Sequence, residues 1–363
     1  MRDIRISVAI IITILICLGV VMIFSSSGVY AAKELGSSSY FLKRHLSYLA
    51  IGLVLMFAAM AFDYRVLSKF AKPILLFAIF LLVLVLIPGI GKEIYGARRW
   101  FRLFGFGFQP SEFAKLAILI YMADFLSRKK DKIKNFVHGF LPAMIALGVT
   151  CLLILKQPDL GTTLLISSAS LIMFFVAGMP LFYLVLIGFL SLPAAYFLVI
   201  RVPYRMRRIQ AFLDPWKDSQ GAGFQLVQSQ IALGSGGIFG IGLGKSLQKL
   251  FYLPAAHTDF VFSIIGEELG LIGTLTVIIL FALFVWQGAR IAKRTEDSFG
   301  YFLAVGIVAM IGLQAIVNIG VSIGAFPTKG LPLPFISYGG SALIAQLISV
   351  GILLNISRTQ DLL

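Results

Sequence analysis

Long apolar stretches separated by short polar loops are the feature that most constrains the fold of this chain. A helix needs about 20 apolar residues to cross the hydrocarbon core of a bilayer, and the 363-residue sequence supplies about ten such stretches. Hydrophobic residues make up 59% of the chain and charged residues 13%, a balance that excludes a water-soluble globular protein. We therefore predict an all-α polytopic membrane protein with about ten transmembrane helices, over residues 6–24, 46–62, 73–90, 111–127, 139–155, 160–177, 181–200, 260–288, 300–325 and 336–356.

The distribution of basic residues predicts which loops lie inside the cell. Short loops rich in Lys and Arg face the cytoplasm in membrane proteins, and the loops 62–72, 127–138 and 289–299 are of this kind. The raw charge count does not decide the orientation by itself, because 201–258 is also basic, but long loops weigh less in this rule. We predict that both termini are cytoplasmic and that the outer face carries the loops 25–45, 91–110, 156–159, 201–258 and 326–335.

The whole chain, residues 1–363, is predicted to form a single integral membrane domain without an internal repeat. Within it, the segment 201–258 is predicted to be a large extracytoplasmic loop between the seventh and eighth helices. Its length indicates a functional or disordered loop, and its aromatic and β-branched residues argue against full disorder. We expect short helices in this loop, lying along the outer surface.

The positive charge of the chain indicates an anionic partner. The formal net charge is +15, from basic residues scattered over loops on both sides, without the fold signature of a nucleic-acid-binding protein. Membrane lipids or a pyrophosphate group are therefore favoured as partners, and no nucleic acid is expected. Cys17 and Cys151 lie in separate apolar runs, so the cysteines indicate neither a disulfide framework nor a metal site.

Asp259 stands where the polar loop 252–259 meets a long apolar run. Thr258 is the predicted N-cap, which would place Asp259 in the first turn of a helix that continues through the apolar run. An acidic side chain at membrane depth costs about 2.5–3.5 kcal/mol, so this position favours a functional role facing the protein interior. The alternative is capping, because a carboxylate in the first turn interacts favourably with the helix dipole.

Other polar residues of the same helix are predicted to share a face with Asp259. Ser263 and Glu267 follow it at helical spacing, and an adjoining strip of small residues allows close approach of another element. The strip consists of Gly266, Gly270 and Gly273. We expect Glu267 and Glu268 to pair with basic residues on neighbouring helices.

Basic residues beside an indole form a second candidate site. Arg98 and Arg99 precede Trp100, and paired guanidinium groups can hold a phosphate bidentately. Interfacial anchoring is the alternative, because Arg and Trp favour the membrane boundary without specific function. Further along, Lys115 follows Glu112 by three residues inside an apolar helix, where it could neutralise that carboxylate or contact a substrate.

A glycine-rich run precedes Asp259 and superficially suggests a phosphate-binding loop around Lys245. The nucleotide-binding motif requires a glycine where this chain has Phe239, and the strand and helix context is missing. The glycines are better explained by close backbone approach in a re-entrant or surface-lying segment, with Lys245 as an anion contact.

Asp159 and His257 are the remaining titratable candidates near the outer face. Asp159 lies in a four-residue loop, where capping of the next helix is favoured over a second catalytic carboxylate beside Asp259. His257 is two residues from Asp259 and could form an acid–base pair with it. A metal hydrolase is not indicated, because the histidines lack any ligand spacing such as HExxH.

Several motifs run in a fixed order across nearly the full length of the chain: ARRWFRL with QPSEFAKL, KQPDLGT, PYRMRRIQAFLDPW with GFQLVQSQIALGSGG, LPAAHTDFVFSIIGEELG and LPFISYGGS. At these motifs the chain resembles the SEDS family. YLPAAHTDF and GLPLPFISYGG are more similar to its division members than to its elongation members, with a sporulation paralogue as the alternative. The family commonly has a glutamate where this chain has Ala255.

The resemblance implies a ten-helix fold and a peptidoglycan glycosyltransferase that polymerises lipid II outside the bacterial cytoplasmic membrane, at the division septum. It implies work with a class B penicillin-binding protein and other division membrane proteins. It also makes Asp259, the aspartate of the HTDF motif, the essential catalytic residue.

The reaction assigns provisional roles to the candidate residues. A sugar hydroxyl attacks an anomeric carbon while a lipid pyrophosphate leaves, so a base and an anion clamp are needed. Asp259 would take the proton, and Arg98, Arg99, Lys245 or a divalent cation, Mg²⁺ or Mn²⁺, would stabilise the pyrophosphate. No cofactor is otherwise implied, and no metal ligands are identified. The expected substrate contacts are completed by Glu112, Lys115, Asp159, His257 and Ser337.

Two other functions use the same features. A lipid II flippase would need the basic loops and a polar helix face without a base, and a structural division scaffold would need neither. A flippase should carry polar residues through the depth of the membrane, whereas the candidate residues cluster at one face. That asymmetry favours catalysis.

Overall fold

The structure is a computed structural model that describes residues 1–94, 96–103, 106–130, 133, 135–200, 202–250, 252–254 and 256–359. Arg201 and Ala255, the position at which the family commonly has a glutamate, lie outside the described residues.

Long apolar helices form most of the molecule, as the hydropathy pattern predicts. They are α1 (Arg2–Leu35), α2 (Tyr40–Ala61), α4 (Ala71–Leu84), α5 (Pro110–Arg128), α6 (Leu141–Lys156) after the π-helical turn η2 (Phe136–Phe140), α7 (Leu160–Val176), α8 (Leu181–Ile200), α11 (Val261–Lys293), α12 (Ser298–Ser322) and α13 (Gly340–Thr359). Every predicted span overlaps one of these helices. Among the described residues, 6 helices are long and apolar enough to cross a membrane, and shorter apolar helices accompany them. The chain is a polytopic membrane protein.

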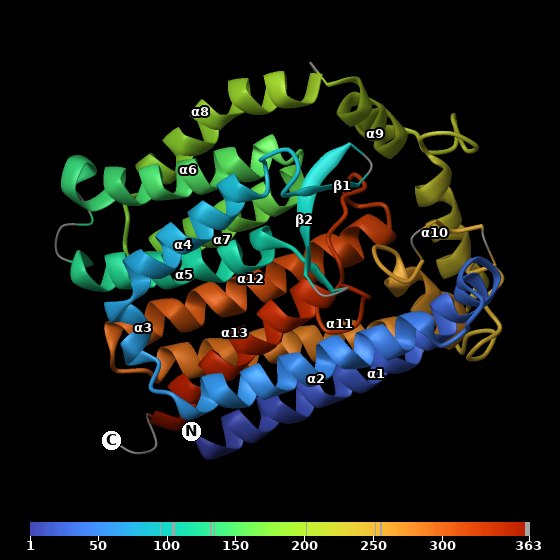
Figure 1. Cartoon of the computed structure of the whole chain (residues 1–363), viewed down its shortest axis with the longest axis horizontal. Coiled ribbons are helices and arrows are strands. Elements are labelled where there is room, and N and C mark those ends of the chain that lie inside the picture. Colours follow the sequence, from blue (N-terminus) through green and yellow to red (C-terminus); the bar gives the residue numbers. More distant parts are fainter. Residues whose placement is uncertain are drawn as a thin grey trace.

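The helices pack as a bundle around α12 and α13. In Figure 1, α13 runs along α2, and α12 lies between α11 and α5; these pairs are in direct contact. Close approach of α13 to α2 depends on Gly351, where an added Cβ would touch the Met56 carbonyl oxygen. Large apolar side chains on the periphery are exposed, among them Val54 at 68% and Phe77 at 61%. An apolar outer surface of this extent suits lipid contact.

The connecting segments gather at one end of the bundle. Between α4 and α5 lies a small antiparallel sheet of β1 (Lys92–Ile94), β2 (Ala97–Leu103) and β3 (Phe106–Phe108), in the order β1-β2-β3. The all-α prediction did not include these strands. The segment 201–258 contains α9 (Pro203–Leu213) and α10 (Phe224–Ser235), the short helices expected there, while α3 (Arg65–Lys69) follows α2. Figure 1 places the sheet, α9 and α10 toward the end opposite the two termini.

Candidate active site

Asp259 lies in the turn before α11, and its backbone is anchored to α12. The helix begins at Val261 with Phe260 as its N-cap residue, so the prediction of Thr258 as N-cap and of Asp259 in the first turn is wrong. The Asn318 side chain donates from Nδ2 to the Asp259 carbonyl oxygen at 2.8 Å and to the Leu331 carbonyl oxygen at 2.8 Å. Asp259 is not the N-cap residue of α11, and among the described residues no side-chain hydrogen bond caps this helix, so the Asp259 carboxylate does not have the capping role.

The surroundings of Asp259 favour the protonated carboxyl group more than water does. Burial raises the pKa of Asp259 to about 6, Arg208 opposes this shift, and Asp159 adds to it. Burial is the largest of these three effects, because it removes water that would stabilise the ionised carboxylate. A carboxylate with this pKa is ionised at neutral pH yet basic enough to accept a proton.

The loop 326–339 covers the Asp259 carboxylate. A Cβ added to Gly330 would lie 3.6 Å from Asp259 Oδ2, so glycine leaves space beside the carboxylate. The preceding residue, Lys329, is half-buried, and burial lowers the pKa of its ammonium group. On the other side, Arg208 of α9 donates from Nη1 to the Thr328 carbonyl oxygen at 3.0 Å. The loop that faces Asp259 therefore contains one cationic residue, Lys329, and is bonded to a second, Arg208.

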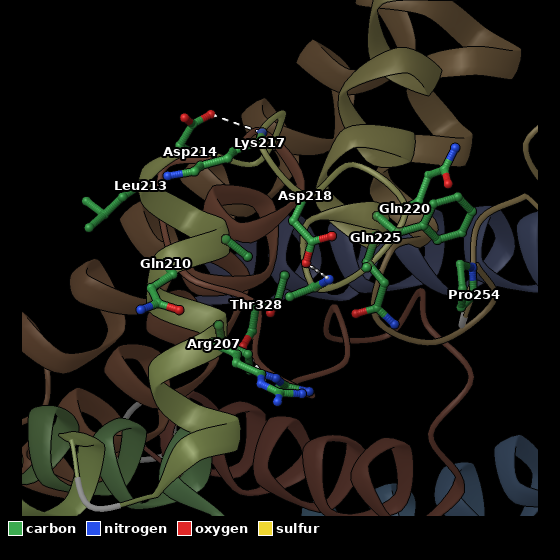
Figure 2. A pocket seen from close by; sticks show the side chains of 15 residues that line it. Arg207, Gln210, Leu213, Asp214, Lys217, Asp218, Gln220, Gln225, Pro254 and Thr328 are labelled. Carbon is green, nitrogen blue, oxygen red and sulfur yellow. Dashed lines mark hydrogen bonds between the residues drawn. The ribbon is translucent and has the colours of Figure 1, made fainter.

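A large polar cleft adjoins this loop. Its volume is 1270 Å³, and it is lined by Arg207, Arg208, Gln210, Ala211, Leu213, Asp214, Lys217, Asp218, Gln220, Gly221, Ala222, Phe224, Gln225, Pro254 and Thr328. Figure 2 shows Arg207 and Gln210 of α9 facing Gln225 and Pro254 across the open space. Arg208 and Thr328 line the cleft, and the charge of Arg208 acts on Asp259, so the cleft and the carboxylate share a wall. The guanidinium groups suit an anionic ligand group, and the amides together with Asp214 and Asp218 suit a ligand that carries many hydroxyl groups.

Asp159 caps α7, as the sequence favoured, and Arg99 braces the same loop. Asp159 Oδ1 accepts from the Thr162 amide at 3.0 Å, and Oδ2 accepts from the Thr162 hydroxyl at 3.0 Å. Arg99 Nε donates to the Gln157 carbonyl oxygen at 2.6 Å, Nη2 donates to that of Pro158 at 2.7 Å, and Nη1 lies 3.8 Å from Asp159 Oδ2. Arg99 thus ties strand β2 to the loop before α7.

Arg98 lies on the exposed side of the sheet. Its Nε is 3.0 Å from Glu93 Oε2, and β1 and β2 pair these two residues directly. An exposed ion pair of this kind contributes about 0–1 kcal/mol to the stability of the protein. The Arg98 guanidinium could therefore leave Glu93 and bind another anion at little cost. A pyrophosphate contact by Arg98 remains a prediction.

Glu112 and Lys115 form a buried ion pair that supports the loop over the site. Lys115 Nζ lies 2.7 Å from Glu112 Oε2 and donates to Gln314 Oε1 at 3.1 Å. Gln314 Nε2 in turn donates to the Pro332 carbonyl oxygen at 2.8 Å. Of the two roles considered for Lys115, the contacts match neutralisation of Glu112, and the pair reaches the site through Gln314.

Gln314 and Asn318 were missed by the sequence reasoning. They lie four residues apart on one face of α12, an otherwise apolar helix, and both are buried. Amide side chains at that spacing in an apolar helix are the available signal, because buried polar groups need partners.

His257 and Ser337 support the site from the side of α1 and α2. The His257 ring lies 4.7 Å from the Phe41 ring and 5.9 Å from the Tyr338 ring, measured between centroids. Burial lowers the pKa of His257 to about 4, so the imidazole is neutral at neutral pH and cannot be the cationic partner of Asp259. Ser337 Oγ accepts from the Leu333 amide at 2.9 Å, which closes the turn of the 333–337 loop.

Lys245 is exposed on a loop that packs against α11. Its neighbour Ser246 donates to Glu267, in the second turn of that helix. Glu268 lies 2.8 Å from Lys249, which belongs to the same loop. The expectation that both glutamates pair with basic residues on neighbouring helices is therefore wrong. No group of three or more His, Cys, Asp or Glu side chains is arranged to hold a metal ion within the described part of the chain.

Known proteins are similar to this chain over nearly its full length. A family model described as a cell cycle protein, FtsW/RodA/SpoVE, matches residues 5–362. A probable peptidoglycan glycosyltransferase FtsW from Geobacter sulfurreducens is 52% identical over 343 residues, covering 94% of this chain and 92% of the relative. Stage V sporulation protein E from Bacillus subtilis is 45% identical over 349 residues, covering 96% and 95%.

Solved structures show the same fold. A chain from a peptidoglycan synthase complex that couples polymerization and crosslinking has a TM-score of 0.80 and 34% identity, with 97% of both chains covered. RodA, the rod shape determining protein of Thermus thermophilus, has a TM-score of 0.73 and 30% identity, with 97% of this chain and 96% of RodA covered. The match over nearly the whole length, in sequence and in fold, shows that this chain belongs to the FtsW/RodA/SpoVE family, the SEDS family that its motifs indicated.

Proposed function

We propose that this protein is a peptidoglycan glycosyltransferase that polymerises lipid II into glycan strands on the outer face of the cytoplasmic membrane, during synthesis of the division septum. The observation that carries the proposal is Asp259, a carboxylate with a raised pKa beside a cleft lined by three cationic side chains, two carboxylates and several amide groups. The names of the similar proteins support the same reaction.

The geometry suits one displacement step. Asp259 accepts the proton of the acceptor sugar's 4-hydroxyl as that oxygen bonds to the anomeric carbon of the donor. The bond from the anomeric carbon to the pyrophosphate oxygen breaks, and the lipid pyrophosphate leaves with the electron pair. Lys329, in the loop that faces Asp259, and Arg208, bonded to that loop, are placed to stabilise the charge that develops on this leaving group.

The basic residues of the cleft extend the predicted anion clamp. Arg207 and Lys217 line the cleft with Arg208, whereas Arg99 uses its donors to hold the loop at Asp159. We therefore assign the principal clamp to Arg208, with Arg98 and Lys245 as further candidates. Within the described residues no cluster of side chains is arranged to hold a divalent cation, and both Asp159 oxygens already accept from Thr162, so the clamp is assigned to cationic side chains alone.

Polymer formation from purified components tests the function. The protein, alone and with its transpeptidase partner, is incubated with lipid II, and the products are separated by length. Glycan strands are expected. If lipid II stays unpolymerised but moves between the leaflets of vesicles, the protein is a flippase. If it shows neither activity, the structural scaffold is the remaining function.

The pH dependence of the rate should report Asp259. Because the base must be deprotonated, the rate is expected to rise with pH through about 6 and to level off above it. Arg208 lowers the pKa of Asp259, so Arg208→Gln should move the midpoint of this rise to higher pH. The measurement is kcat from pH 5 to 8, with each variant normalised to its own plateau.

Lys217→Gln is the control for that shift. Lys217 also lines the cleft but is not among the charges that act on Asp259, so its removal should leave the midpoint in place. If wild type and Arg208→Gln have the same midpoint, the pH dependence of kcat does not report the ionisation of Asp259.

We further propose that the protein works in the bacterial cytoplasmic membrane with both termini in the cytoplasm, beside a class B penicillin-binding protein and other membrane proteins of division. The position of both termini at the end of the bundle away from the sheet, α9 and α10 supports this orientation. A structural relative that comes from a peptidoglycan synthase complex supports the partner.

Thiol labelling tests the orientation. In a background without Cys17 and Cys151, Lys217→Cys and Lys130→Cys both place one thiol at an exposed position. A membrane-impermeant reagent is expected to label the first in intact, wall-permeabilised cells and to reach the second only after lysis. The reverse pattern would place the cleft in the cytoplasm and exclude polymerisation outside the membrane.

A further inference from the structure

Helix α11 is interrupted at its tenth residue. Gly270 has φ 67° and ψ −160°, which is not helical, so the helix consists of an outer half, Val261–Leu269, and an inner half that begins at Leu271. In a continuous helix the Leu271 and Ile272 amides would donate to the Glu267 and Glu268 carbonyl oxygens. The interruption leaves these four backbone groups without their helical partners.

One stretch of the glycine-rich loop supplies all four replacements. The Leu271 amide donates to the Gly237 carbonyl oxygen at 2.9 Å, and the Ile272 amide donates to that of Ile238 at 3.2 Å. In the other direction, the Ile241 amide donates to the Glu267 carbonyl oxygen at 3.0 Å, and the Gly242 amide donates to that of Glu268 at 3.1 Å. The loop is therefore inserted into the helix, which is how irregular backbone is satisfied in an apolar environment.

Glycine is required for this insertion. A Cβ at Gly236 would fall on the Gly266 carbonyl oxygen, and a Cβ at Gly240 would fall on the carbonyl oxygen of Glu268. Gly240 also has φ +79°, which disfavours every other residue. The run that superficially suggested a phosphate-binding loop is thus explained by contact with α11.

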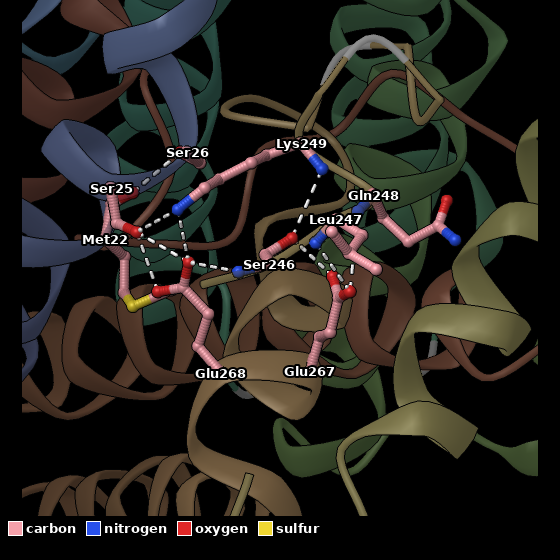
Figure 3. A network of polar contacts seen from close by, with 9 residues as sticks. All are labelled: Met22, Ser25, Ser26, Ser246, Leu247, Gln248, Lys249, Glu267 and Glu268. Atoms are coloured by element: carbon pink, nitrogen blue, oxygen red, sulfur yellow. Dashed lines mark hydrogen bonds and ion pairs between the residues drawn. The ribbon is translucent and has the colours of Figure 1, made fainter. Parts of the chain in front are cut away.

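Buried side chains lock the inserted loop in place (Figure 3). Both Glu268 oxygens accept from the Ser25 hydroxyl of α1 at 2.7 Å, and Glu268 Oε1 lies 2.8 Å from Lys249 Nζ. Glu267 accepts from the Ser246 hydroxyl and, at 2.9 Å, from the Leu247 amide. Lys249 is 6% exposed and Glu268 0%, so neither charge can exchange its partner for water.

We propose that the segment 236–249 is a positioning element for Asp259, acting through the outer half of α11, and that Gly240, Lys249 and Glu268 are its positioning residues. Asp259 is joined to the outer half through Phe260 alone, and at Gly270 that half has lost two backbone hydrogen bonds to the rest of the helix. The inserted loop and the link to Ser25 therefore help to set where the half-helix lies, together with the hydrogen bond between Ser263 and Ser229 of α10. This inference rests on the proposed function, in which the position of the Asp259 carboxylate determines the rate.

The first test is Gly240→Ala, which should expel the loop from the interruption. A displaced base lowers turnover more than substrate binding, so kcat should fall about 10- to 100-fold, while KM for lipid II should change less than about twofold. Gly234→Ala is the matched control, because its added Cβ meets no atom within 4 Å. A folded Gly240→Ala protein with wild-type kcat would overturn the proposal.

Hydrogen exchange separates this proposal from the proposed function. In Gly240→Ala, and not in Gly234→Ala, the amides of residues 261–272 should exchange faster, whether or not the protein polymerises lipid II. If the wild type makes no polymer, the proposed function fails, and the exchange data still decide whether the loop holds the half-helix. Unchanged exchange in Gly240→Ala would reject that holding role.

The second test separates positioning from charge neutrality with the double variant Lys249→Met/Glu268→Met. Replacing a buried ion pair by apolar side chains of similar volume is often neutral for stability, so the thermal unfolding temperature should stay near that of wild type. The links to Ser25 are lost, however, so kcat should remain about tenfold lower at unchanged KM. Recovery of both stability and kcat would show that Lys249 and Glu268 serve only to neutralise each other.

Discussion

Replacing Asp259 by asparagine is expected to lower the rate of glycan polymerisation by about 10²- to 10⁴-fold, the usual contribution of a general base. Asparagine keeps the shape of the side chain but cannot accept the proton of the attacking hydroxyl. The fold should be unaffected, because Asn318 anchors Asp259 through its backbone carbonyl oxygen rather than its carboxylate. The measurement is kcat/KM for lipid II with purified protein, together with the thermal unfolding temperature.

Asp63→Asn is the matched control for this substitution. Asp63 is an exposed carboxylate after the far end of α2, and its Oδ1 accepts from the Arg65 amide, a bond that asparagine can also make. Its polymerisation rate should equal that of wild type. If Asp259→Asn polymerised lipid II at a comparable rate, Asp259 would not be the base.

Replacing Lys115 by methionine is expected to destabilise the protein by about 3–5 kcal/mol, the typical cost of removing one partner of a buried ion pair. Glu112 and Lys115 side chains are only 4% and 6% exposed, so water cannot substitute for the lost ammonium group. The free energy of unfolding in mixed micelles measures the effect.

The double variant Glu112→Gln/Lys115→Met tests the cause of that loss. With no carboxylate left to bury, most of the stability should return. Activity should recover less, because Lys115 also bonds to Gln314, which holds the Pro332 carbonyl oxygen in the loop over Asp259. A single Lys115→Met variant as stable as wild type would show that Glu112 is neutralised by another group.

Three kinds of residue contribute to the proposed site. In the proposed reaction Asp259 and Arg208 act on the reacting groups; Arg208 lines the cleft, and its charge acts on Asp259. Asn318 and Gln314 hold the two loops that meet at the site. Glu268 acts at a greater distance, through the half-helix that follows Asp259. We therefore expect losses in kcat to decrease in that order.

Much of the fold could be predicted from the sequence, because a membrane span is a local property. In lipid every backbone polar group needs an internal partner, so a long apolar stretch must become a helix wherever it occurs. Each predicted span overlaps a helix for this reason. Asp259 was identified on similar grounds, since an acidic residue at the edge of an apolar run is costly without a function.

The start of α11, the partners of the glutamates and the cleft itself were decided by tertiary structure. Arg208 meets Thr328, Asn318 meets Asp259, and Lys249 meets Glu268, across separations that hydrophobic periodicity does not encode. Even the interruption at Gly270 is stable only because the loop 237–242 replaces the missing hydrogen bonds. The sequence by itself determined which segments are helical and which acid is exceptional. Packing between distant segments decided what surrounds that acid, because the surroundings of Asp259 include Asp159 at the N-cap of α7, Arg208 of α9 and Asn318 of α12, which meet only in the folded protein.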